Sequence, residues 1–456
     1  LIFSQAIHLL SSACSFANYI QNLCAACTPT MLNVEVNSHE TIMPSTPTPA
    51  HLLSLPLSVT DQLAPDTYIQ AILFFHSDNT TPSTKGALLK DSLSKTLAHF
   101  YPLAGRLSGD IVDANVHVEC NDQGVEFFEA TVEGDLETFL KKPPTGELNK
   151  LMPNEGANIR HGDPLLAVQL NVFTCGGIAL GVCIAHQVAD ATSMGIFLDG
   201  WAEVAREAKL SSPPRFHAAW VFPAANLPFP LVPPKVIESL PKRFVLTGPK
   251  IDLLREEAAY ARAQPPTRVE AITALIWRCV VRARPNATVD ENHKRIPVAL
   301  MNVNLRKKMP EELSDHSFGS LATWAFVADD SVEKGSGKEM QGHLEKALRD
   351  AIQNVSGEFV REQVEGFLSG KIQVYGAIMD TMEFSSWCRF SFYQTNFGWG
   401  EPAWFCTVMK DLVNLAVLVD TKDGHGVEVW VWLPEKDMKI FETDPELLEF
   451  IDQDSY

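Results

Sequence analysis

The sequence predicts an α/β protein built from two domains of similar size. The chain has 456 residues, which is too long for a single hydrophobic core of ordinary size. Segments with helical periodicity alternate with apolar, β-branched segments on both sides of a proline-rich stretch at 211–244. We therefore expect one domain over residues 31–210, a linker over 211–244 and a second domain over 245–456.

The N-terminal half alternates strand and helix patterns. The segment 67–75 is continuously apolar and rich in β-branched and aromatic residues, which predicts a strand buried on both faces. Residues 87–100 carry leucines four positions apart, as one face of a helix does. The segments 116–120 and 125–130 flank an NDQG turn and predict a hairpin. Two more paired strands are expected over 166–186, and a helix follows them.

The C-terminal half has equally regular periods. We expect helices at 251–262, 268–282 and 337–353, and strands at 297–304, 412–419 and 427–433. The last two strands flank a DGHG turn. The stretch before this half contains many prolines and little periodicity, which is typical of a linker.

Composition and charge narrow the possible functions. Hydrophobic residues make up 46% and charged residues 20% of the chain, which is a globular composition. The formal net charge of -19 argues against binding to nucleic acid or to anionic membranes, since both need basic patches. No apolar run is long enough to span a membrane. The nine cysteines are scattered with one CxxC pair, so we expect no metal site and reduced thiols in the cytosol.

Residues 1–30 differ from the rest of the chain. They contain no Lys, Arg, Asp or Glu, and Met31 follows them directly. A secretory signal needs a basic region before its apolar segment, and this stretch has none. We therefore expect residues 1–30 to be a leader outside the fold, whose removal leaves stability and function unchanged.

The segment CIAHQVADATS, residues 183–193, contains the most informative pair of polar side chains. His186 is expected where a buried strand ends, and Asp190 follows where a helix begins. An imidazole at the end of a strand is held rigidly at a cleft and titrates near neutral pH, as a proton-transfer residue must. Because a corner separates the two residues, Asp190 need not contact His186 and is suited to cap the helix or to pair with a remote cation.

The same pair also fits other roles. A histidine with purely structural contacts and an aspartate that caps a helix would give the same spacing, which occurs by chance in many proteins. A metal site would need a third ligand, and none is obvious. The two residues alone leave these alternatives open.

Four further segments give the pair a context: HFYPLAGRL (99–107), PTRVEAITALIWRC (266–279), VNLRKKM (303–309) and SSWCRFSFYQTNFGWGEP (385–402). Together with His186 and Asp190, and in this order, they resemble the BAHD acyltransferases over about residues 31–450. The VEAITALIW and SSWCRF variants look most like the branch that contains vinorine synthase and salutaridinol acetyltransferase.

This resemblance implies two chloramphenicol-acetyltransferase-like domains with a channel at their interface. His186 would lie in the channel as general base, with acyl-CoA entering one mouth and a small-molecule alcohol the other. The activity would be transfer of an acyl group to a hydroxyl of a plant specialised metabolite such as an alkaloid or terpenoid. The branch suggests acetyl-CoA as donor. No cofactor would be bound permanently, and the enzyme would be a cytosolic monomer.

The resemblance also assigns supporting residues. Arg306 of VNLR would pair with Asp190 and clamp the corner that carries His186 to the opposite domain. The NFGWG segment stands where the family has DFGWG, and it would shape a loop near the coenzyme mouth. Its supporting residues would be Asn396, Gly398, Trp399 and Gly400. The segment after this loop would extend the N-terminal sheet. The basic cluster best placed for the coenzyme phosphates is Lys242, Arg243 and Lys250, with solvated surface positions as the alternative.

Three other functions compete with acyl transfer. A condensation domain would share the fold and the His-x3-Asp spacing, but it normally has two consecutive histidines, whereas Ala185 precedes His186. A catalytically weakened relative that only binds small molecules would more often have lost His186. The change from Asp to Asn396 is the feature that favours this alternative. A serine hydrolase would need a G-x-S-x-G turn, which the sequence lacks. Trp387, Trp399 and Trp404 are candidates for lining the channel, with core packing as the alternative.

Overall fold

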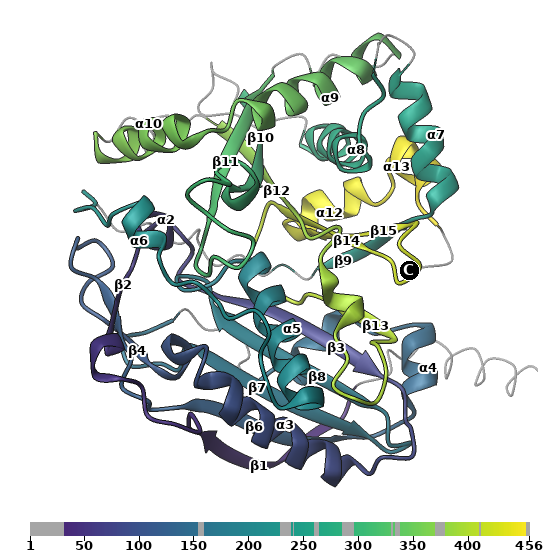
Figure 1. The fold of residues 1–456 in the computed structure, drawn as a ribbon. Coiled ribbons are helices and arrows are strands. Elements are labelled where there is room, and N and C mark those ends of the chain that lie inside the picture. Colours follow the sequence, from purple (N-terminus) through teal and green to yellow (C-terminus); the bar gives the residue numbers. More distant parts are fainter. Residues whose placement is uncertain are drawn as a thin grey trace, which may run out of the picture.

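Two six-stranded sheets, each covered by helices, form a mixed α/β fold as predicted (Figure 1). The computed structural model describes residues 32–153, 159–228, 239, 241–259, 264–284, 296–329, 332, 338–369, 379–409 and 412–452. The expected leader at 1–30 and residues 229–238 of the proline-rich stretch lie outside the described residues. In the part that is described, no helix has the length and apolar character needed to cross a membrane.

The first sheet has the strand order β1-β6-β7-β8-β3-β13. Its strands are β1 (Val34–Ile42), β3 (Tyr68–Phe75), β6 (Val125–Val132), β7 (Leu166–Phe173), β8 (Ile178–Ala185) and β13 (Trp404–Cys406). Every residue of β3 is buried, and β7 and β8 form an antiparallel pair, so these strand predictions are confirmed. Figure 1 shows α3 (Pro82–Leu97) and α5 (Ala191–Glu207) lying together across one face of this sheet.

The hairpin predicted from 116–120 and 125–130 is wrong. β5 (His117–Glu119) belongs to a small sheet with β2 (Ser54–Pro56) and β4 (Arg106–Ser108), whereas β6 pairs with β1 and β7. The glycine of the expected turn has another role. A Cβ on Gly124 would lie 2.7 Å from the backbone oxygen of Ile42, and its φ is +84°. The glycine therefore lets the chain pass close to β1 as it leaves one sheet for the other.

The second sheet has the order β11-β10-β12-β14-β15-β9. Its strands are β9 (Lys242–Leu246), β10 (Ile296–Asn304), β11 (Ala322–Ala328), β12 (Met379–Ser386), β14 (Leu415–Asp420) and β15 (Val427–Trp432). Three predicted helices are present as α7 (Gly248–Ala259), α8 (Arg268–Ala283) and α9 (Lys338–Gln353). The last residues of the predicted linker 211–244 are part of a strand, since β9 begins at Lys242 and pairs with β15 at the edge of this sheet.

One strand crosses from the second sheet to the first. β13 lies between β12 and β14 in the sequence, yet it pairs antiparallel with β3. Aromatic residues of the same excursion, Phe392, Phe397 and Phe405, pack in the first core. A segment after Asn396 therefore extends the first sheet, as the family resemblance implies. The domain limits 31–210 and 245–456 stay predictions.

The remaining elements are short. The helices are α2 (Val59–Gln62), α4 (Leu136–Lys141), α6 (Ala218–Val221), α10 (Gly357–Leu368), α12 (Glu435–Phe441) and α13 (Pro445–Phe450). Short 3-10 segments occur at Ala50–Leu52, Tyr101–Ala104, Thr145–Leu151, Leu305–Lys307 and Ser391–Gln394. Two of these elements, α2 and α10, carry residues of the cavity described next.

Candidate active site

His186 follows β8 directly, at the point where this strand leaves the sheet. Its backbone N–H donates to the carbonyl of Thr67 at 2.9 Å, and β8 is bonded to β3 and β7 on either side. The side chain is partly exposed to a cavity of about 360 Å³, which is a usual size for a small-molecule site. The strand end therefore holds the imidazole rigidly at a cavity wall, as the sequence predicts.

The cavity is built from both halves of the chain. Its walls come from the segment after α2, the corner at His186, strands β10, β11 and β12, and helix α10. Of the three tryptophans considered for the channel, Trp387 lines this cavity. Trp399 is half-buried and stacks on Phe397 at the edge of the first core, and Trp404 is buried against Phe74, so neither of these two lines the cavity.

Ser320 fixes the tautomer of His186. The Ser320 hydroxyl donates to the backbone oxygen of His186 at 2.8 Å, and its oxygen lies 3.0 Å from His186 Nδ1. A hydroxyl has one hydrogen, so in this contact its oxygen accepts and Nδ1 carries the proton. The neutral ring then has an unprotonated Nε2, which is the form a general base needs.

The surroundings of His186 keep the ring neutral. Burial lowers the pKa of His186 below its ordinary value, because desolvation disfavours the charged imidazolium. Its own backbone carbonyl and the negative charges of Asp190 and Glu383 oppose this effect without reversing it. The imidazole is thus available to accept a proton at neutral pH.

Asp190 and Arg306 form the buried ion pair that the family resemblance implies. Nη1 of Arg306 donates to Oδ2 of Asp190 at 2.7 Å, and Nη2 donates to Oδ1 at 3.2 Å. The carboxylate also accepts the backbone N–H of Ser193 at 2.7 Å, as N-cap of α5, and that of Leu321 at 3.0 Å. Asp190 is 5% exposed and Arg306 2% exposed. The pair therefore joins the corner after β8 to the second half of the chain.

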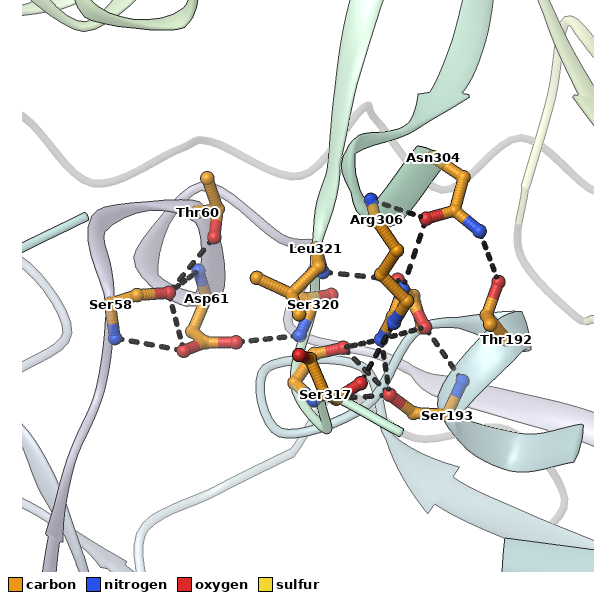
Figure 2. Close-up of polar contacts among 12 residues, drawn as sticks. Ser58, Thr60, Asp61, Thr192, Ser193, Asn304, Arg306, Ser317, Ser320 and Leu321 are labelled. Carbon is orange, nitrogen blue, oxygen red and sulfur yellow. Dashed lines mark hydrogen bonds and ion pairs between the residues drawn. The ribbon is translucent and has the colours of Figure 1, made fainter. Parts of the chain in front are cut away.

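Arg306 also bonds to the loop that precedes β11 and to the first turn of α5. Nε donates to the backbone oxygen of Ser317 at 2.7 Å, and Nη2 donates to Ser193 Oγ at 2.9 Å. Ser193 Oγ donates in turn to the carbonyl of Gly319 at 2.8 Å and accepts its N–H at 3.0 Å. Figure 2 shows Arg306, Ser193 and Ser317 converging at the start of α5. The loop that carries Ser320 is thereby fixed against the helix that follows His186.

Asp61 holds Ser320 from the other side, and the sequence analysis did not single out either residue. Oδ1 of Asp61 accepts the backbone N–H of Ser320 at 2.7 Å, and Oδ2 accepts the N–H and hydroxyl of Ser58 at 2.8 and 2.6 Å (Figure 2). Burial raises the pKa of Asp61 to about 6. The Ser58–Asp61 capping box is visible in the sequence as S-x-x-D. Its contact with a residue 259 positions away is not.

The NFGWG loop is held by its own asparagine. Oδ1 of Asn396 accepts the backbone N–H of Gly398 at 2.8 Å and that of Gly400 at 3.1 Å. Arg206 donates to the backbone oxygen of Asn396. Both glycines have positive φ, 115° and 105°, which the turn requires. An amide oxygen makes the same two bonds as a carboxylate, so the change from Asp to Asn keeps the loop bonded. None of these residues lines the cavity.

Arg243, the third residue of the expected coenzyme cluster, has a structural contact and does not line the cavity of His186. Its Nη1 lies 3.1 Å from Oε1 of Glu428, whose carboxylate is buried, and its guanidinium lies over the ring of Trp404. The indole N–H of Trp404 donates to the same carboxylate at 3.0 Å. Because β13 carries Trp404 and β15 carries Glu428, this cluster joins the two sheets. Arg243 therefore neutralises the buried negative charge of Glu428.

The two lysines of the expected coenzyme cluster also lie away from the cavity. Lys242 pairs with Glu442, and Lys250 donates to the backbone oxygen of Glu449 at 2.5 Å. Neither lysine lines the cavity that contains His186. Their assignment to the coenzyme phosphates stays a prediction.

Among the described residues, one group of side chains has the spacing of a metal site: Cys279, Asp444 and Glu446. Its carboxylates are bonded to a guanidinium, since Nη2 of Arg282 donates to Asp444 at 2.9 Å and to Glu446 at 2.7 Å. The group is thus explained as an ion-pair network around α13. It lies outside the cavity of His186.

Removing one partner of the Asp190–Arg306 pair should strongly destabilise the protein. Asp190→Ala leaves a buried guanidinium without its carboxylate, so we expect the free energy of unfolding to fall by about 3–5 kcal/mol. Asp190→Asn should cost less, because its amide oxygen still accepts hydrogen bonds. The matched control is Asp315→Ala, which breaks the exposed pair with Lys307 and should cost less than about 1 kcal/mol. Chemical denaturation measures all three, and equal losses for the Asp190→Ala and Asp315→Ala variants would contradict the account.

The chain is similar to known proteins over most of its length. A family model described as "Transferase family" matches residues 32–448. The chain is 35% identical to limonoid 21-O-acetyltransferase of Melia azedarach over 431 residues, covering 92% of this chain and 98% of that protein. It is 35% identical to vinorine synthase of Rauvolfia serpentina over 437 residues, with the same two coverages. Salutaridinol 7-O-acetyltransferase of Papaver somniferum is 33% identical over 480 residues, again with coverages of 92% and 98%.

Solved structures share the fold over the same span. The crystal structure of vinorine synthase has a TM-score of 0.78 and 33% identity, covering 93% of this chain and 100% of that chain. The crystal structure of F. graminearum TRI101 complexed with coenzyme A and deoxynivalenol has a TM-score of 0.68 at 16% identity, covering 88% and 99%, which is a likeness of fold alone. Because the family model and relatives above 30% identity cover nearly the whole described chain, the protein belongs to the Transferase family, that of the BAHD acyl-CoA-dependent O-acyltransferases.

Proposed function

We propose that this protein transfers an acetyl group from acetyl-CoA to a hydroxyl of a plant specialised metabolite, with His186 as general base. The observation that carries the proposal is the place of the His186 ring at the wall of a cavity, with Nδ1 3.0 Å from the hydroxyl oxygen of Ser320, a contact that favours an unprotonated Nε2. The similar proteins named above as O-acetyltransferases support acetyl as the group transferred.

The reaction needs one residue that moves a proton twice. Nε2 of His186 takes the proton from the acceptor hydroxyl as the hydroxyl oxygen forms a bond to the thioester carbonyl carbon. When the tetrahedral intermediate collapses, the carbon–sulfur bond breaks and the imidazolium returns the proton to the thiolate of coenzyme A. The products are the ester and the free thiol. Direct transfer needs no acyl-enzyme, because both substrates meet in one cavity.

Asp190 supports this chemistry through geometry. Its carboxylate is bonded to Arg306, Ser193 and Leu321, whereas Nδ1 of His186 is bonded to Ser320. Asp190 therefore positions the corner and the loop around the base, and the imidazole is oriented by a hydroxyl in place of the carboxylate of a catalytic triad.

The finer parts of the proposal rest on the family resemblance. We keep Lys242 and Lys250 as candidate contacts of the coenzyme phosphates, a cytosolic location and a monomeric state. The acceptor is an alcohol of the alkaloid or terpenoid kind. No observation favours the condensation-domain or weakened-relative alternatives, since Ala185 precedes a single histidine and Asn396 keeps its two loop bonds.

Loss of the base should remove most of the activity. His186→Ala should reduce turnover by roughly 10²–10⁴, the usual cost of removing a general base. Thiol release from acetyl-CoA in the presence of a pool of plant alcohols measures the rate. His316→Ala, which removes an exposed histidine, is the control and should have normal turnover. Near-normal turnover in the His186→Ala variant would refute the assignment.

The pH dependence of kcat/KM should report the same group. A general base acts in its neutral form, so activity is present above its pKa and is lost as the pH falls through it. Because burial lowers the pKa of His186, the midpoint of the acid limb should lie below the ordinary value of 6.5. Asp61 titrates in the same pH range, with a pKa of about 6, so the Asp61→Asn variant distinguishes the two groups. An acid limb that arises from His186 should persist in this variant. A midpoint above 6.5 would contradict the proposal.

The Arg243→Gln substitution should lower the stability of the protein and leave the KM for acetyl-CoA unchanged. Arg243→Gln leaves Glu428 buried without a cation, so we expect the free energy of unfolding to fall by about 3 kcal/mol. The KM for acetyl-CoA should not change. Lys250→Gln is the control for stability alone, because the contact of Lys250 with the described residues is a hydrogen bond to a backbone oxygen at the surface, and its stability should be normal. An increased KM at unchanged stability would restore Arg243 to the coenzyme site.

A further inference from the structure

Two carboxylates that line the cavity beside His186, those of Asp66 and Glu383, take no part in the proton transfer, and Glu383 is the one bonded to an aromatic side chain of the lining. Glu383 lies on β12 and lines the cavity together with Ser385 and Ser386 of the same strand. Its Oε1 accepts the side-chain N–H of Asn302 at 2.7 Å and the indole N–H of Trp324 at 3.4 Å. Oε2 has no hydrogen-bond partner among the described residues. One oxygen is thus anchored to the protein, and the other is free to contact a ligand.

No protein cation compensates this carboxylate in the part of the chain that the structure describes. The cavity lining contains no lysine or arginine, and Arg306 is already bonded to Asp190. His186 is kept neutral by burial, so it does not supply a positive charge at neutral pH. A carboxylate facing a mostly apolar cavity without a cation is costly. A positively charged ligand group would offset that cost.

The aromatic residues beside Glu383 also favour a cation. Trp324 and Phe367 both line the cavity, and their rings contact each other with centroids 6.2 Å apart. Aromatic faces attract organic cations, most strongly where water is excluded. The donor substrate has the opposite preference, because the phosphates of acyl-CoA are repelled by a carboxylate. Glu383 therefore belongs to the part of the cavity that receives the acceptor.

We propose that Glu383 binds a protonated amine of the acceptor, so that the preferred substrates are alcohols that also carry a basic nitrogen. This inference rests on the proposed function, which it narrows from plant specialised metabolites in general to amino alcohols. The ammonium group would lie against Oε2 of Glu383 and beside Trp324, and the hydroxyl would reach Nε2 of His186. Neutral alcohols of the same shape would leave the carboxylate unpaired and would bind more weakly.

A matched pair of primary alcohols tests the inference directly. N-methylpiperidinyl-methanol and methylcyclohexyl-methanol with the same substitution pattern differ only in a ring nitrogen against a ring carbon, and the amine is protonated at neutral pH. The wild-type enzyme should acetylate the amine with a kcat/KM at least about tenfold higher, the usual effect of a hydrogen bond to a charged group. In Glu383→Gln, which keeps the shape and removes the charge, the two alcohols should become equal.

Two control variants locate the effect. Glu358→Gln removes the same charge from an exposed position of α10 outside the cavity lining and should keep the amine preference. Asp66→Asn removes the other carboxylate of the lining that has no described ion pair and should keep it too. Equal use of the two alcohols by the wild type, or a preference that survives in Glu383→Gln, would overturn the inference. A preference lost only in Asp66→Asn would overturn it as well.

Calorimetric titration of the two alcohols into each variant separates this inference from the proposed function. If both alcohols are acetylated equally, acyl transfer stands and the role of Glu383 fails. If neither is acetylated but the amine alone binds, and only when Glu383 is present, the role of Glu383 stands and the proposed function fails. Absence of any amine-selective binding to the wild type overturns the inference.

Discussion

The buried ion pair between Asp190 and Arg306 is the constraint on which the site depends. It fastens the corner after β8 to the loop before β11, two segments from different halves of the chain. Breaking such a pair leaves an uncompensated buried charge, so the two halves are held in one arrangement at that point. The loop brings Ser320 to His186, and the hydroxyl of Ser320 favours a proton on Nδ1 of the ring. A contact remote from the reacting atoms thereby sets the chemical state of the base.

The cavity combines parts with separate physical roles. The imidazole of His186 is the proposed site of proton transfer, and apolar and aromatic side chains form much of the surrounding wall. Glu383 adds a charge that is complementary to a cation, in a lining that has no lysine or arginine among the described residues. The link between the sheets lies elsewhere, in the cluster of Arg243, Trp404 and Glu428. In the proposed mechanism, proton transfer and acceptor recognition rest on His186 and Glu383, and the link between the sheets rests on Arg243 and Glu428, so substitutions can separate these roles.

Local patterns predicted most of the elements and the place of His186 at the end of β8, but not the contacts between distant segments. Periodicity predicted β3, the β7–β8 pair and α8, because burial dictates their sequences. The resemblance to a family supplied the pair of Asp190 with Arg306 and the crossing strand. The NDQG hairpin was wrong, since Gly124 serves a close approach to β1. Ser320, Asp61 and the use of Arg243 against Glu428 were missed, because no local signal records a partner in another part of the chain.

The central claim is that His186 is neutral, with its proton on Nδ1, when substrates arrive. Nitrogen NMR of the protein labelled at histidine ring nitrogens tests this most directly, with His186 assigned by comparison with the His186→Gln variant. At neutral pH the account predicts a protonated Nδ1 and an Nε2 with the shift of an unprotonated ring nitrogen. In the Ser320→Ala variant this preference should weaken. A proton on Nε2 with a bare Nδ1, or a fully protonated imidazolium at neutral pH, would contradict the account.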